Sequence, residues 1–127
     1  MSYKVLIVDD SKLARMAVNR VLNVLYPDWA RVEAASSEEA LLSIEQAHPD
    51  IALLDFNMPG RNGLELAADL RQSNPQMQVA VISANRQQEI LNRATAMGAA
   101  FLGKPLTEEA LAAFLKSAVR ALGGSAS

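Results

Sequence analysis

The chain has 127 residues, of which 50% are hydrophobic, and its formal net charge is -2; this length suits one domain with its own core. It has no cysteine and one histidine, which excludes disulfides, thiolate metal sites and histidine-based zinc sites, so oxygen atoms must bind any metal. It also lacks a long apolar run, a cleavable signal and a cluster of basic residues. We therefore expect a cytoplasmic protein that binds neither membranes nor nucleic acid directly.

Short apolar and β-branched runs alternate with longer stretches of helical periodicity. We predict five helices and five strands, the strands at residues 5–8, 31–34, 51–54, 79–82 and 100–102. Ser36 and Asn62 each precede a glutamate by three residues, as a helix N-cap does, and Gly98 is placed to end the fourth helix. This alternation with short connections favours a parallel sheet covered on both faces, an α/β fold. We expect one doubly wound (βα)5 domain over residues 1–122, followed by a flexible tail or linker stub at 123–127.

The turn after the first predicted strand contains no glycine. Its residues are Asp9, Asp10, Ser11 and Lys12. Dinucleotide-binding and Walker loops need glycines at this turn so that backbone amides can surround the phosphates, and neither motif occurs in the chain. The sequence therefore argues against a nucleotide-binding site.

Polar side chains follow four of the predicted strands. They are Asp9 and Asp10 after the first strand, Asp55 after the third, Ser83 after the fourth and Lys104 after the fifth. In an open parallel sheet, ligands bind beyond the carboxyl ends of the strands, near the point where the strand order reverses. We therefore expect these side chains to converge on one edge of the sheet.

Such a cluster has a surplus of negative charge. Two carboxylates 4 Å apart repel by about 4 kcal/mol at an effective dielectric constant of about 20, so three of them need a cation. A shallow, all-oxygen site that keeps several waters suits Mg²⁺ better than Ca²⁺. Lys104 supplies one positive charge and is better placed to contact an oxygen of a phosphoryl group. Since an aspartate can attack phosphorus and form an aspartyl phosphate, this set of residues predicts phosphoryl transfer to the protein.

These motifs, taken in order, resemble the receiver domain of two-component response regulators, the CheY-like family. Residues 5–10, VLIVDD, resemble the family's first strand and acidic pair, and residues 53–60, LLDFNMPG, resemble its phosphoacceptor segment. Ser83 with its following alanine, and Lys104 with its following proline, resemble the residues after the family's fourth and fifth strands. The resemblance covers nearly the whole chain and implies a sheet with strand order 2-1-3-4-5.

The resemblance implies roles for the residues that match the family's motifs. Asp55 accepts the phosphoryl group, Asp10 and Asp55 bind Mg²⁺ through their carboxylates, Asp9 does so mostly through water, and Asn57 offers a backbone carbonyl. The implied phosphoryl donor is a sensor histidine kinase or a phosphotransfer protein. The implied output is a downstream protein target or a covalently linked output domain. The protein would thus be a signalling switch that catalyses only its own phosphorylation and dephosphorylation, and not a metabolic enzyme.

The resemblance also implies a conformational switch. Ser83 and Lys104 contact the phosphoryl group, while Phe101 occupies the position of the family's switch aromatic. The Lys104–Pro105 peptide bond is expected to be cis, because this turn aims the lysine amine over the acceptor carboxylate.

Simpler interpretations exist for each residue. Asp9 and Asp10 could cap a helix, Asp55 could be a turn residue, Ser83 a strand-end hydroxyl, and Lys104 a solvated charge. Two other functions also remain. A receiver-like module can bind a partner without being phosphorylated, although such modules usually lack one of the acids, the hydroxyl or the lysine. A haloacid dehalogenase-like phosphatase also forms an aspartyl phosphate, but it carries a second acid two residues after its nucleophile, where this chain has Ser11.

Overall fold

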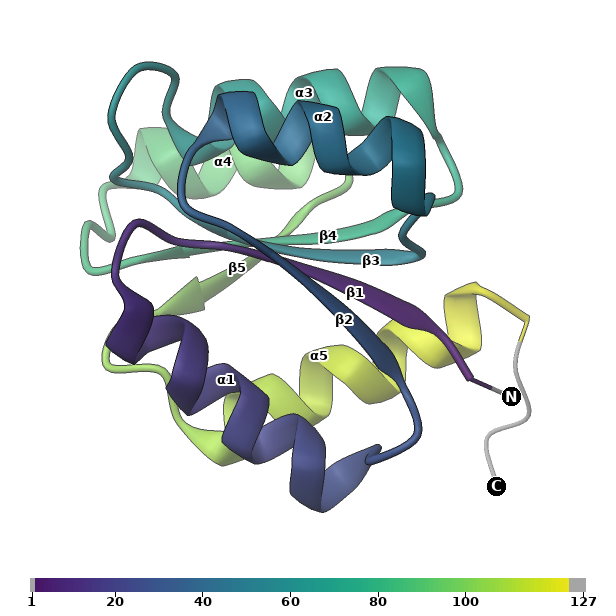
Figure 1. The fold of residues 1–127 in the computed structure, drawn as a ribbon. Coiled ribbons are helices and arrows are strands. Elements are labelled where there is room, and N and C mark those ends of the chain that lie inside the picture. The colour runs from purple at the N-terminus through teal and green to yellow at the C-terminus, as the bar shows by residue number, and fades with distance from the viewer. Residues whose placement is uncertain (1, 124–127) are drawn as a thin grey trace.

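A computed structural model describes residues 2–123, in which a five-stranded parallel sheet lies between two layers of helices (Figure 1). The strands are β1 (Lys4–Val8), β2 (Ala30–Ala34), β3 (Ile51–Asp55), β4 (Gln78–Ser83) and β5 (Ala100–Gly103). The helices are α1 (Lys12–Leu25), α2 (Ser37–Ala47), α3 (Gly63–Ser73), α4 (Gln88–Ala96) and α5 (Glu108–Ala121). Apart from Gly123, the expected tail lies outside the described residues.

The strand order is β2-β1-β3-β4-β5, which confirms the predicted α/β fold. The chain passes from β1 to β2 on one side and then returns to β3 on the other, so the order reverses between β1 and β3. The carboxyl ends of all five strands therefore lie at one edge, and the reversal point is between Val8 and Leu54, which are paired in register. This is the place where open α/β sheets bind ligands.

Two hydrophobic clusters hold the layers together. The helices α2, α3 and α4 cover one face of the sheet, and α1 and α5 cover the other (Figure 1). Successive side chains of a strand point to opposite faces, so in β1 Leu6 packs under α2 to α4, whereas Ile7 packs against α1 and α5. All five residues of β3 are buried because this strand is central in the sheet. The strand that ends in Asp55 is thus fixed on both faces.

Helices α1, α2 and α3 each begin at a residue whose side chain caps the helix, and in α1 this residue is not one of the acidic pair. Ser36 accepts a hydrogen bond from the Glu39 amide, and Asn62 with Glu65 forms a complete capping box. The cap of α1 is Ser11, whose hydroxyl accepts from the Ala14 amide, so the acidic pair before it does not cap this helix. Within residues 2–123, no helix combines the length and the apolar character that crossing a bilayer requires.

Candidate functional site

Three carboxylates meet at the carboxyl edge of the sheet. Asp9 and Asp10 follow β1 directly, and Asp55 is the last residue of the neighbouring strand β3. One carboxylate oxygen from each residue lies within 4.8 Å of the other two. Asp55 and Asp9 are buried, with 3% and 9% of their surface exposed, whereas Asp10 is exposed. The strand order thus brings Asp55 next to two acids that precede it by 46 and 45 residues in the sequence.

Lys104 reaches the same place from the end of β5. Its Nζ lies 2.7 Å from Asp55 Oδ1, and its backbone N–H donates to the Ser83 carbonyl at 3.0 Å. The Lys104–Pro105 peptide bond is cis, as the family resemblance implied. Among the described residues no donor makes a well-directed hydrogen bond to the buried Asp55 Oδ1, so its contact with the ammonium is an ion pair.

The charges of the site perturb one another. Burial raises the pKa of Asp9, and the negative charges of Asp55 and Asp10 raise it further, against the lowering effects of the Ser11 amide and the Lys104 ammonium. Burial lowers the pKa of Lys104, but the contact and charge of Asp55, with the charges of Asp9 and Asp10, outweigh burial and leave it raised. One lysine thus faces three acids at a partly buried site, and ionisation of Asp9 is less favourable there than in water.

This donor set fits a magnesium ion. Carboxylate oxygens are the ligands that Mg²⁺ prefers, and a divalent cation would offset the repulsion from Asp55 and Asp10 that, together with the larger effect of burial, raises the pKa of Asp9. The buried and incompletely satisfied Asp55 Oδ1 is an oxygen that a cation or a further donor would stabilise. One carboxylate oxygen from each of Asp9, Asp10 and Asp55 could contact such an ion.

The loop that follows Asp55 depends on a glycine that the sequence analysis did not single out. A Cβ atom on Gly63 would lie 2.5 Å from the Asp55 carbonyl oxygen and 2.9 Å from the Phe56 Cα, so only glycine allows α3 to start this close to β3. The Gly63 N–H donates to the Phe56 carbonyl at 2.9 Å and closes the loop. Asn57 lies in this loop and is exposed, two residues after Asp55.

Ser83 and Phe101 lie on the adjacent strands β4 and β5. Ser83 is 1% exposed, and its hydroxyl oxygen accepts a hydrogen bond of 2.9 Å from the Asn85 amide. Phe101 is half-buried and packs against the cluster under α2 to α4. The parallel register pairs Val81 with Phe101 and Ser83 with Gly103. The hydroxyl and the ring are therefore close along neighbouring strands.

A cavity of about 540 Å³ opens from the acids between α1 and the connection from β5 to α5. Asp9, Asp10, Asp55 and Lys104 line one end. The remaining wall is largely apolar and includes Ala14, Val18 and Val21 of α1 together with Leu106 and Leu111. Asp55 is thus buried at the end of its strand and also lines this cavity.

Comparison with known proteins identifies the family. A family model described as the response regulator receiver domain matches residues 5–116. The chain belongs to the response regulator receiver domain family. Receiver domains are phosphoacceptors of two-component signalling and not metabolic enzymes, which sets the haloacid dehalogenase alternative aside.

Receiver domains in longer regulators are similar in sequence. The chain is 43% identical over 122 residues to the positive alginate biosynthesis regulatory protein of Pseudomonas aeruginosa, covering 91% of this chain and 47% of that protein. It is 34% identical over 96 residues to the nitrate/nitrite response regulator protein NarL of Escherichia coli, covering 75% of this chain and 44% of that protein. The chain spans about half the length of these curated relatives.

Solved receiver structures share the fold. The chemotaxis protein CheY4 of Vibrio cholerae superposes with a TM-score of 0.82 at 28% identity, covering 93% of this chain and 99% of that chain. A CheY-like receiver domain protein of Methanospirillum hungatei gives a TM-score of 0.87 at 23% identity, covering 97% and 98% of the two chains. The resemblance inferred from the motifs is thereby confirmed.

We predict that Asp9→Asn stabilises this receiver domain when no divalent cation is present. The substitution removes a buried charge from a cluster of like charges, while the asparagine oxygen can still accept the Ser11 amide. The melting temperature should rise by about 2–5 °C. Calorimetry in a chelating buffer measures it, with Asp28→Asn at an exposed position as the control. A melting temperature lowered by Asp9→Asn alone would contradict the repulsion described here.

Proposed function

We propose that Asp55 accepts a phosphoryl group in a Mg²⁺-dependent reaction, and that the phosphorylated receiver domain switches a downstream partner. The observation that carries this proposal is the buried Asp55 carboxylate, which lies 2.7 Å from Lys104 Nζ and within 4.8 Å of two further carboxylates. Family membership supports it independently.

The chemistry follows from the groups at the site. A carboxylate oxygen of Asp55 attacks the phosphorus of a phosphohistidine whose other ring nitrogen carries a proton. The phosphorus–nitrogen bond breaks, its electron pair stays on the nitrogen, and neutral imidazole leaves, which yields the aspartyl phosphate. Mg²⁺, when bound, neutralises charge on the phosphoryl oxygens. Lys104 exchanges its contact with the free carboxylate for one with a phosphoryl oxygen, because its side chain is 37% exposed and can follow the new charge. The backbone carbonyl of Asn57 is a further candidate ligand for the ion.

The switch would run from the phosphoryl group to the surface of β5. A phosphoryl group brings oxygens that need donors, and the Ser83 hydroxyl accepts from Asn85 but has its own proton free to donate. Movement of Ser83 toward the phosphoryl group vacates space beside β5. Phe101 can fill this space only by changing rotamer, which couples the reaction to the surface formed by α4, β5 and α5.

The partners follow from the same role. We assign phosphoryl donation to a sensor histidine kinase or a phosphotransfer protein, and the output to a protein target or a linked output domain. The length of the curated relatives, about twice that of this chain, supports an output domain linked to the receiver at residues 1–122. We also propose that the protein acts in the cytoplasm. A phosphorylation-independent module is less well supported, because the acids, the hydroxyl and the lysine are all present.

Phosphorylation should require both Asp55 and a divalent cation. Incubation with acetyl phosphate and Mg²⁺ should add one phosphoryl group to the wild type and none to Asp55→Asn, which keeps the side-chain shape but loses the nucleophile. Intact-mass spectrometry reads the result, with Asp28→Asn as the matched control that should label fully. Added mass in Asp55→Asn, or labelling that survives a chelator, would refute the assignment.

Ser83→Ala should separate binding of the phosphoryl group from the response to it. The variant lacks the hydroxyl that moves, but it keeps the acids and Lys104, so beryllium fluoride with Mg²⁺ should still bind. The chemical-shift changes at residues 83–85 and around Phe101 should fall by about half or more, whereas Ser73→Ala, at an exposed position, should respond fully. A full wild-type shift pattern in Ser83→Ala would show that the signal takes another route.

A further inference from the structure

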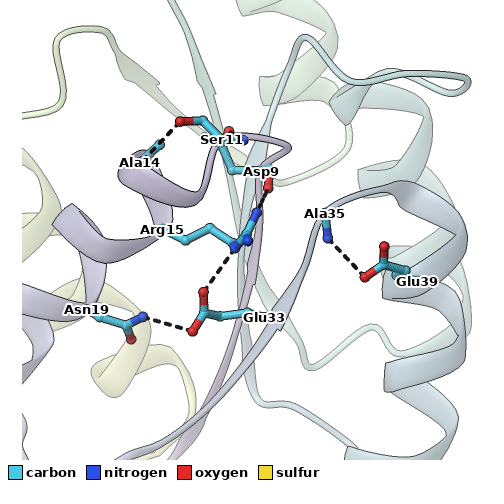
Figure 2. A network of polar contacts seen from close by, with 8 residues as sticks. All are labelled: Asp9, Ser11, Ala14, Arg15, Asn19, Glu33, Ala35 and Glu39. Carbon is cyan, nitrogen blue, oxygen red and sulfur yellow. Dashed lines mark hydrogen bonds and ion pairs between the residues drawn. The ribbon is translucent and has the colours of Figure 1, made fainter.

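Arg15 connects helix α1, the end of β1 and the edge strand β2 (Figure 2). Its Nη1 donates to the backbone carbonyl of Asp9, and its Nε donates to Glu33 Oε1 at 2.9 Å. Asn19, one turn further along α1, donates to the other oxygen of Glu33 at 3.2 Å. These contacts hold the guanidinium from two sides. The Arg15 side chain is only 15% exposed, so it is largely shielded from water.

The position of Asp9 is fixed through each of its polar groups. Its N–H donates to the Ala34 carbonyl at 3.0 Å, its carboxylate accepts from the Ser11 amide at 2.8 Å, and its carbonyl accepts from Arg15. That carbonyl belongs to the planar peptide that joins Asp9 to Asp10, so a donor that fixes the carbonyl also fixes the N–H and the direction of Cα at Asp10.

We infer that Arg15 is a positioning residue for the cation site: by holding the Asp9 carbonyl, it aims the carboxylate of Asp10 at the other two acids. Asp10 needs such help because it is exposed, in contrast to the buried Asp9 and Asp55. Glu33, fixed in turn by Asn19, keeps the guanidinium in the orientation that reaches the Asp9 carbonyl. The inference rests on the proposed binding of Mg²⁺ at these acids.

Whether removal of Arg15 strengthens or weakens Mg²⁺ binding distinguishes a positioning role from a purely electrostatic one. Arg15 is a cation close to a cation site, so its removal should strengthen Mg²⁺ binding if only its charge mattered. If it positions the acids, its removal weakens binding, because partners that orient metal ligands typically contribute about 10-fold or more to metal affinity.

The experiment measures the Mg²⁺ dissociation constant by isothermal titration calorimetry. Arg15→Met should raise it about 10-fold. The double variant Arg15→Met/Glu33→Gln, which keeps the net charge of the wild type, should raise it by a similar factor. Arg15→Lys keeps the charge, but one ammonium cannot replace the two-sided guanidinium contact, so we expect a rise of roughly threefold.

Arg71→Met is the matched control for loss of a structural arginine. Arg71 donates to the carbonyls of Pro75, Met77 and Met97, at the opposite end of the sheet from the acids. Its replacement should lower the melting temperature without changing the Mg²⁺ dissociation constant.

Each outcome is decisive. If the wild type does not bind Mg²⁺, the proposed function and this inference both fail. If the wild type binds and Arg15→Met binds equally or more tightly, only the positioning role fails. An equal loss in Arg71→Met would also overturn it, because general destabilisation would then explain the result. If Arg15→Met does not fold, Arg15→Lys decides, and a wild-type dissociation constant in that variant refutes the role.

Discussion

The repulsion among Asp9, Asp10 and Asp55 is the constraint on which the properties of the site depend. Left to themselves, three carboxylates would move apart, and each pair at 4 Å costs about 4 kcal/mol at an effective dielectric constant of about 20. They stay within 4.8 Å because β1 and β3 are adjacent strands, paired from Val5 with Ile51 to Val8 with Leu54 and buried on both faces of the sheet. The core therefore maintains a cluster of negative charge that is suited to a divalent cation.

The same buried strands connect the acids to the rest of the sheet. Lys104 approaches Asp55 from β5, and its backbone is hydrogen-bonded to the carbonyl of Ser83 at the end of β4. Asp55 is thus connected through Lys104 to the backbone at the ends of β4 and β5. Gly63 allows the next helix to start against the backbone of Asp55, which helps to hold Asp55 in place.

The fold and the acidic cluster were predictable because they depend on patterns local to each strand. Apolar runs mark the strands, and polar residues after them mark the functional edge, so Asp55 and Lys104 could be singled out without coordinates. Hydrogen bonding extends β4 to Ser83 and β5 to Gly103, beyond the predicted ends. The ends were predicted from apolar runs, and the backbone hydrogen bonds between strands do not depend on the hydrophobicity of the side chains.

Other features depend on distances between segments that are far apart in the sequence. The contact of Arg15 with Asp9 and Glu33 joins a helix to two strands, and periodicity alone marks this arginine only as one charge on α1. The close approach of Gly63 to Asp55 is likewise visible only in three dimensions. Ser11, and not the acidic pair, caps α1, so the Asp10 carboxylate is not used in the cap, while the Asp9 carboxylate accepts a hydrogen bond from the Ser11 amide.

The most direct test of the account is the chemical identity and position of the phosphorylated group. Borohydride reduces an acyl phosphate, but not a free carboxylate, and converts the modified aspartate to homoserine. After incubation with phosphoramidate and Mg²⁺, reduction and peptide mass spectrometry should find homoserine at position 55 and unmodified aspartate at positions 9 and 10. Homoserine at position 9 or 10, or a phosphoryl group that resists reduction on a hydroxyl residue, would contradict the account.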